Sequence, residues 1–221
     1  MPLIRAPAGG DPAPPSDPRA APALPADIAA LKAALDQGGP DQRRSAARTL
    51  AGLPGAAGLL AQALAGEADE RVREALFTGL AGIGTEEGAD LLLPLLRSPD
   101  AGLRRGALDA LAAMPARLPA RLPALLRDAD PAVRLLACGL ARGLPSGEAT
   151  ALMCTVLERE AEPNVCAAAV DVLAELGEPQ ALPVLERCAG RLAASAFLVF
   201  AVEIAVRRIR AASGPAGEAG A

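Results

Sequence analysis

Four cysteines carry the most reactive side chains of this 221-residue sequence, which contains no histidine. The chain therefore lacks the commonest general base and the commonest transition-metal ligand. None of the cysteines forms a CxxC pair, and their spacing matches no zinc site. Three fall within apolar, helix-forming stretches, where a cysteine acts as a small hydrophobic residue. We interpret all four as reduced core thiols, with a redox or nucleophilic role as the alternative: Cys138, Cys154, Cys166 and Cys188.

Other catalytic patterns are missing from the sequence as well. It holds no Ser-His-Asp set, no phosphate-binding P-loop and no nucleotide-binding glycine fingerprint. The glycines fall at turns and tails, and the AGIG stretch at 81–84 reads as a helix end. We therefore predict a protein that is not an enzyme and that binds no metal and no cofactor.

Charge and composition argue against a nucleic-acid partner. The net charge is −4, the isoelectric point is about 5.0, and aromatic residues make up 1% of the chain. A nucleic-acid-binding protein usually presents a basic face and often aromatic stacking platforms. Here 22 basic residues are interleaved with 26 acidic ones. We therefore predict that the partner is not a nucleic acid.

The elements that carry these residues are predicted to be helices. Hydrophobic residues make up 52% of the chain and are mostly Ala and Leu, which favour helices over strands. An acidic residue recurs three places before an apolar one, where it can cap a helix. Five apolar anchor residues, of which the first four follow such an acid, lie about 30 to 32 residues apart and begin amphipathic stripes of the i, i+4, i+7/8, i+11 kind. These anchor residues are Val72, Leu103, Val133, Val165 and Phe197.

Each of the first four predicted helices is followed by a turn and a second Leu-rich segment, and a weaker unit with Ala46, Leu50 and Leu53 comes before them. The second segments lie at residues 89–97, 116–127, 149–159 and 179–191. Two helices per repeat of about 31 residues is typical of an α-solenoid, in which stacked pairs share one core. We predict an all-α fold with about five to six helical hairpins.

The repeats resemble the HEAT superfamily, in particular the short bacterial units known from phycobilisome lyases. The resemblance is carried by DERVR at 69–73, DAGLR at 100–104 and DPAVR at 130–134, and by second helices such as LLLPLL at 91–96. It implies a right-handed α–α superhelix over residues 25–210. It also implies that the repeated charged residues connect neighbouring repeats. These residues are Asp69, Asp100, Asp130, Arg73, Arg104 and Arg134. The alternative is that the three arginines form an anion-binding row.

The two ends of the chain are predicted to be tails. Residues 1–24 are rich in Pro and Gly, and residues 211–221 read as disordered. No stretch reaches the roughly 18 to 20 apolar residues that a membrane span needs. The N-terminus has no apolar core of a signal peptide. We expect no membrane partner and a cytoplasmic protein.

Two surfaces are candidates for binding another protein. The last helix is apolar around most of its circumference, and Leu198, Val199, Val202 and Val206 would form a docking or self-association patch if exposed. The alternative is that this helix sits deeper against the preceding pair. The second helices, which usually line the concave face of such solenoids, alternate in charge and offer a basic group between acidic ones. That basic group consists of Arg117, Arg121 and Arg127.

The sequence therefore indicates a protein–protein interaction scaffold or adaptor, of the kind found in bacterial signalling, motility or assembly systems. The alternative is a maturation factor, similar to the chromophore lyases, that uses the repeats to hold a client protein. A DNA-lesion enzyme built of helical repeats is disfavoured by the acidic balance and the scarcity of aromatic residues.

Overall fold

A computed structural model describes residues 26–191 and 195–213 of the chain. The predicted N-terminal tail, residues 1–24, lies outside the described residues. Most of the predicted C-terminal tail does so too, but the last helix continues through Ala212, two residues beyond the predicted boundary. The solenoid therefore extends slightly further than residue 210.

The described residues form α-helices and short 3₁₀ helices, with no strand among them. In chain order these are α1 (Ala26–Gln37), α2 (Pro40–Leu50), α3 (Ala57–Leu64), α4 (Glu70–Ile83), α5 (Glu86–Leu92), η1 (Leu93–Arg97), α6 (Ala101–Ala112), η2 (Pro115–Arg117), α7 (Leu122–Leu125), α8 (Pro131–Leu140), η3 (Ala141–Gly143), α9 (Ser146–Arg159), α10 (Pro163–Leu176), η4 (Pro179–Ala181), α11 (Leu182–Arg191) and α12 (Ala196–Ala212).

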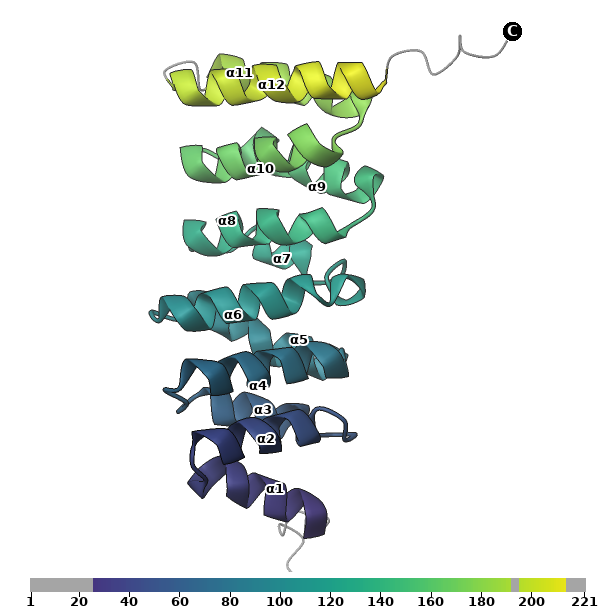
Figure 1. Ribbon diagram of the computed structural model, residues 1–221. Coiled ribbons are helices and arrows are strands. Elements are labelled where there is room, and N and C mark those ends of the chain that lie inside the picture. The colour runs from purple at the N-terminus through teal and green to yellow at the C-terminus, as the bar shows by residue number, and fades with distance from the viewer. Residues whose placement is uncertain (1–25, 192–194, 214–221) are drawn as a thin grey trace, which may run out of the picture.

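The helices stack in two rows, as Figure 1 shows. The first row contains α2, α4, α6, α8, α10 and α12, and each of these packs on the next. The second row contains α3, α5, α7, α9 and α11 and lies behind the first. Helix α1 packs against α2 at one end of the stack, and α12 ends it without a second-row partner of its own among the described residues. The chain is thus an all-α repeat solenoid with five hairpins between two single helices, as predicted.

Acidic residues start three of the first-row helices. The carboxylates of Asp69, Asp100 and Asp130 each accept a hydrogen bond from a backbone N–H of the first helical turn. These bonds satisfy donors that the helix itself cannot pair. The predicted caps are therefore confirmed, with one exception: the Glu162 side chain makes no cap bond to α10.

The prediction of Phe197 as the anchor of the last helix was wrong by one residue. Ser195 caps α12 by accepting a hydrogen bond from the Leu198 N–H. Ser195 therefore lies three residues before Leu198, as Asp69 lies three residues before Val72. Leu198 is therefore the equivalent of Val72, and Phe197 is not an anchor. Consistent with this, Leu198 is buried and Phe197 is exposed.

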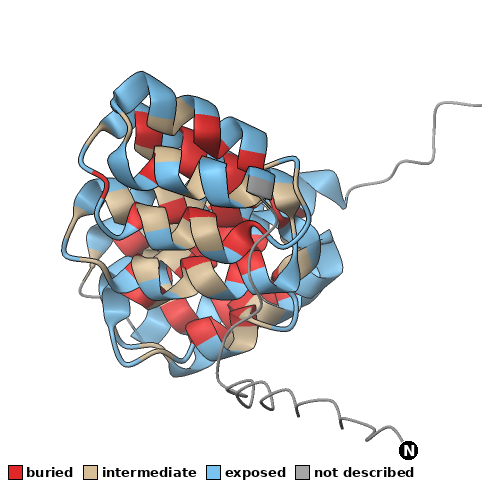
Figure 2. Cartoon of the chain, turned by 90° about the horizontal axis from the view of Figure 1, so that it is seen from below, coloured by how far each residue is buried: buried red, intermediate tan, exposed pale blue. Residues whose placement is uncertain are grey.

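One continuous core runs between the two rows. Each first-row helix buries the face that the periodicity predicts, for example Val72, Leu76 and Leu80 of α4. Figure 2 shows buried residues alternating with intermediate and exposed ones along the helices that face the viewer. Because each hairpin contributes only one layer to this core, neighbouring hairpins depend on one another for burial.

The second helix of the third hairpin is shorter than predicted. Residues 116–127 were expected to form one helix, but α7 covers only Leu122–Leu125. Pro119 and Pro123 interrupt the segment, because proline has no N–H to donate to a helical bond. Leu118 and Leu122 are still buried, so the segment packs as predicted although it is mostly not helical.

Three of the four thiols are core residues. Cys138, Cys166 and Cys188 are buried and unpaired, and Cys154 is partly buried. Burial raises the pKa of the Cys138 thiol to about 12, so this group stays protonated at neutral pH. A protonated thiol is a poor nucleophile.

None of the described helices is long and apolar enough to cross a membrane.

Candidate protein-binding surfaces

The junctions between hairpins are held by arginines of the first-row helices. Each of these arginines lies one residue after the anchor position and donates to a backbone carbonyl of the loop just before its own helix. Arg73 Nε lies 2.6 Å from the Glu67 carbonyl oxygen, and Arg104 Nη1 lies 2.6 Å from that of Ser98. These carbonyl groups lie in loops, where no helical hydrogen bond pairs them. A hydrogen bond from a charged arginine therefore stabilises the junction.

Two of the first-row arginines, Arg73 and Arg134, also reach an acidic side chain of the following junction. The Arg73 guanidinium lies 3.0 Å from the Asp100 carboxylate. Arg134 forms a bidentate pair with Glu160, with nitrogen–oxygen distances of 2.7 and 3.1 Å, and also binds the Asp128 carbonyl oxygen at 2.8 Å. We call this series the junction ladder: Arg43, Glu67, Arg73, Asp100, Arg104, Arg134 and Glu160.

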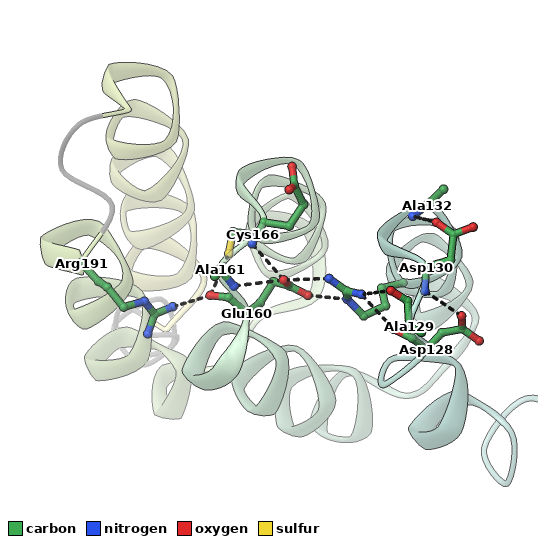
Figure 3. A network of polar contacts seen from close by, with 10 residues as sticks. Asp128, Ala129, Asp130, Ala132, Glu160, Ala161, Cys166 and Arg191 are labelled. Atoms are coloured by element: carbon green, nitrogen blue, oxygen red, sulfur yellow. Dashed lines mark hydrogen bonds and ion pairs between the residues drawn. The ribbon is translucent and has the colours of Figure 1, made fainter.

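Figure 3 shows the C-terminal part of the junction ladder as one network that runs from Asp128 and Asp130 through Glu160 to Arg191. Where α10 has Cys166 in place of an arginine, the thiol lies 3.6 Å from the Glu160 carbonyl oxygen. Arg191 of α11 binds the same carbonyl oxygen at 3.2 Å. Arg73, Asp100 and Arg134 therefore connect neighbouring repeats as expected, whereas Asp69, Asp130 and Arg104 bond within their own helix or the loop before it.

The arginine contacts change the acidity of two ladder carboxylates. Hydrogen bonds from Arg43 hold the pKa of Glu67 below its ordinary value, and hydrogen bonds from Arg134 do the same for the pKa of Glu160. Bonds from backbone N–H groups of the adjacent loop lower both pKa values further. Both side chains are largely buried. They are therefore ionised partners that the fold requires.

Two of the three predicted partner-binding arginines are occupied within the chain. Arg117 lies 2.8 Å from the Glu86 carboxylate and binds the Gly84 carbonyl oxygen at 2.9 Å. Arg121 pairs with Glu86 and, at 2.7 Å, with Asp90, and its side chain is only 13% exposed. The alternation of charge along the second helices is thus used for pairing between hairpins. Arg117 and Arg121, predicted as partner-binding residues, are thus both engaged by acids of the preceding hairpin.

Arg127, the third of these arginines, lines a groove between α7 and α9. The cavity measures about 460 Å³. Its apolar lining comes from Leu126, Leu152 and Val156, and Arg127 and Arg159 lie at its exposed rim. We call it the second-row groove. It lies beside the short α7, where the proline-interrupted segment covers α9 incompletely.

The rim of the second-row groove carries positive charge. Arg134 and Glu160, which also line it, pair with each other, and Asp128 pairs with Arg97. Arg127 donates to the Pro123 carbonyl oxygen, and neither Arg127 nor Arg159 pairs with an acid in the part of the chain that the structure describes. An apolar floor with two such arginines suits an apolar side chain with acidic neighbours.

The predicted patch on the last helix is only partly at the surface. Leu198 and Val202 are buried with relative exposures of 1% and 4%, because they face the core between α10 and α11. Val199 and Val206 are half-buried. For Leu198 and Val202, the structure therefore agrees with the alternative to a docking patch, in which the last helix packs deep against the preceding pair of helices.

The exposed apolar residues of α12 are on another side of the helix. Phe197 and Phe200 are 71% and 59% exposed. With Ile204 they line a cavity of about 500 Å³ against α10, whose wall is formed largely by alanines such as Ala167. We call these residues the phenylalanine face. Sequence reasoning missed it because Phe197 was assigned to the core.

Among residues 26–191 and 195–213, no three or more Cys, Asp or Glu side chains come together as a metal site would require. The second-row groove and the phenylalanine face are surface sites among these residues.

The sequence matches the family described as HEAT repeats over residues 57–125 and 118–195, more than half of the chain. The chain belongs to the HEAT-repeat family. No curated protein sequence matches it significantly.

Solved structures with a similar fold share little sequence with this HEAT-repeat chain. A crystal structure of an engineered protein is 18% identical and covers 84% of this chain and 97% of its own, with a TM-score of 0.42. The complex of CpcE and CpcF of phycocyanin lyase from Nostoc sp. PCC7120 is 22% identical, with 83% and 82% covered and a TM-score of 0.37. A designed armadillo repeat protein in complex with the peptide (KR)4 is 18% identical, with 83% and 100% covered and a TM-score of 0.41. At these TM-scores the likenesses carry no argument about function.

The junction ladder predicts how stability depends on pH. Because Glu67 and Glu160 have pKa values below the ordinary 4.5 in the folded chain, their contribution is complete above pH 4.5 and is lost as pH falls through the lower folded values. We expect the melting temperature to fall below about pH 4.5. The variant Glu67→Gln/Glu160→Gln should lose about 1.5–3 kcal/mol per site at pH 7 and show a weaker acid dependence.

Thermal unfolding followed by circular dichroism from pH 3 to pH 8 measures this. Asp36→Asn is the control, because the Lys32–Asp36 pair is solvent-exposed and such pairs contribute little. Equal acid dependence in the double variant and the wild type would contradict a stabilising role for the two carboxylates.

Proposed function

We propose that this HEAT-repeat protein is a non-catalytic scaffold or adaptor that binds a segment of another protein in the second-row groove. The single observation that supports this most strongly is the groove itself, which combines an apolar floor with two arginines that no described acid neutralises. Elsewhere in the stack, Arg117, Arg121 and Arg142 each pair with an acid of the neighbouring hairpin.

The size of the second-row groove suits a peptide segment. A cavity of about 460 Å³ is large enough for one or two apolar side chains, yet it is open to solvent along its rim. Leu152 and Val156 lie one helical turn apart on α9 and offer a continuous apolar strip. The bound segment would place an apolar side chain on this strip and Asp or Glu residues beside Arg127 and Arg159.

The rigidity of the second-row groove supports the same function. Arg134 and Glu160 form one end of its lining and belong to the junction ladder, so their positions are fixed by several hydrogen bonds. A preformed site loses less entropy on binding than one that must be ordered first. The ladder thus holds a binding surface between hairpins without contributing chemistry of its own.

Selection from a displayed random peptide library tests this proposal. Enriched peptides should share an apolar residue with acidic residues near it. Their affinity should fall about tenfold or more in Arg127→Glu/Arg159→Glu, because two attractive charges become repulsive. The control is Arg105→Glu/Arg187→Glu, which makes the same charge change at exposed positions outside the groove.

Enriched peptides without acidic residues, or equal loss of affinity in both double variants, would contradict the proposed role of the groove. Melting temperatures of all variants verify that the comparison is made between folded proteins.

The phenylalanine face supports a second proposal, self-association of two copies through α12. Phe197 and Phe200 are two of the three phenylalanines of the chain, and both are exposed on one helix. Exposed aromatic residues next to an apolar groove are typical of an interface. A twofold dimer would bring the same face of both copies together, so that each phenylalanine pair meets the alanine-lined cavity of the other copy.

Light scattering coupled to size-exclusion chromatography tests self-association. The wild type should show a mass above the 22.2 kDa of one chain, increasing with concentration, and Phe197→Gln/Phe200→Gln should return it to 22.2 kDa. Leu135→Gln is the control, because Leu135 is also an exposed large apolar residue but lies on α8. A wild-type mass of 22.2 kDa at every concentration would rule the dimer out.

A further inference from the structure

A second groove lies on the first row of helices, near the other end of the stack. It is formed between α2 and α4 and measures about 560 Å³. Arg44 and Arg48, one helical turn apart on α2, line one wall, and Arg71 of α4 lines the other. We call it the arginine groove. It shares no lining residue with the second-row groove.

Small residues line the arginine groove between these walls. Ala51, Ala75 and Gly79 contribute little side-chain volume. At Gly79 the helices approach closely, since a Cβ atom there would lie 3.1 Å from Leu60 Cδ1 and 3.2 Å from the Ala51 Cβ. The result is a hollow flanked by long basic side chains, with the Thr78 hydroxyl also at its edge.

The arginines of this groove outnumber the acids beside them in the described part of the chain, which are Glu74 and Asp69. Glu74 is the only acid in its lining. Arg71 approaches Asp69 at 3.7 Å, longer than a direct hydrogen bond, and is largely exposed. Within the described ranges, Arg44 and Arg48 make no hydrogen bond or ion pair through their side chains, unlike Arg43 and Arg73 on the same two helices. Three arginines with one acid are unusual in a chain whose net charge is −4.

We propose that the arginine groove binds an acidic segment of a protein, whose carboxylate or phosphoryl groups are held by Arg44, Arg48 and Arg71. Guanidinium groups bind both kinds of oxyanion with paired hydrogen bonds, and clusters of them recognise acidic and phosphorylated peptides. The two arginines of α2 contact successive anionic groups of the segment, and Arg71 closes on it from α4. This inference goes beyond the scaffold function and does not depend on the second-row groove.

The experiment measures fluorescence anisotropy of three labelled peptides with the full-length protein at low and at physiological salt. One peptide contains glutamates, the second contains phosphoserines at the same positions, and the third contains glutamines. The first or the second should bind, more weakly at higher salt, and the third should not. Tighter binding of the phosphoserine peptide would identify a phosphorylated partner, and equal or tighter binding of the glutamate peptide would identify a carboxylate-rich one.

Variants locate the binding on the molecule. Arg44→Gln/Arg48→Gln should weaken binding of the acidic peptide about tenfold or more, because charged hydrogen bonds are lost. Arg207→Gln/Arg208→Gln makes the same charge change on α12 and should leave the affinity unchanged. Glu74→Gln removes the only acid from the groove and should strengthen binding by about two- to fivefold. This gain cannot result from misfolding.

Several outcomes would overturn the proposal. It is wrong if none of the three peptides binds at low salt, or if the glutamine peptide binds as well as the others. It is also wrong if both double variants weaken binding equally, since binding would then follow net charge alone. Tighter binding of duplex DNA than of either acidic peptide, lost in Arg44→Gln/Arg48→Gln, would assign the groove to nucleic acid instead. If the displayed peptide library yields no ligand for the second-row groove, the scaffold proposal fails, but the outcomes for the arginine groove are unaffected.

Discussion

The structure depends on one constraint: no helical hairpin of this chain can bury its apolar face alone. The core is therefore continuous from α1 to α12, and each hairpin supplies one layer of it. The loops between hairpins are held by the junction ladder, in which arginines bind carbonyl groups of the loop before their own helix and Arg73 and Arg134 also bind an acid of the next junction. Apolar burial supplies most of the stabilisation, and the ladder fixes how neighbouring hairpins are placed.

This constraint also decides which charged residues remain for function. Arg43, Arg73 and Arg134 of the ladder, and Arg121 on the second row, are paired with acids about one repeat away. Arg127 and Arg159, and separately Arg44 and Arg48, fall outside these positions and face grooves. Candidate binding surfaces thus appear where the repeated pattern of pairing is interrupted. In the second-row groove the interruption has a visible cause, because prolines reduce α7 to a single turn.

The sequence predicted the solenoid well because its signals are local and repeated. Asp69 and Val72 mark a helix start in any context, and the period of about 31 residues follows from their recurrence. The last helix was misplaced by one residue because a serine caps it in place of an acid, so Phe197 was assigned to the core in place of Leu198. The pairing of Arg121 with Glu86 and Asp90 could not be read from charge alternation, since a solvated face and a paired face have the same composition. Which side chains line a groove depends on how successive hairpins meet, and no local pattern encodes that.

We propose that a partner protein lies in the second-row groove. Site-specific photocrosslinking tests it most directly, with a photoreactive residue in place of Thr155, which lines the groove, or of Thr49, which is exposed on α2. The two positions are matched, because each hydroxyl only bonds the carbonyl four residues earlier in its own helix. In native lysate we expect a crosslink from position 155 to one defined protein and no such crosslink from position 49. The crosslink from position 155 should be lost when Arg127 and Arg159 are replaced by glutamate. The same crosslinked proteins from both positions, or a Thr155 crosslink that survives the charge reversal, would contradict it.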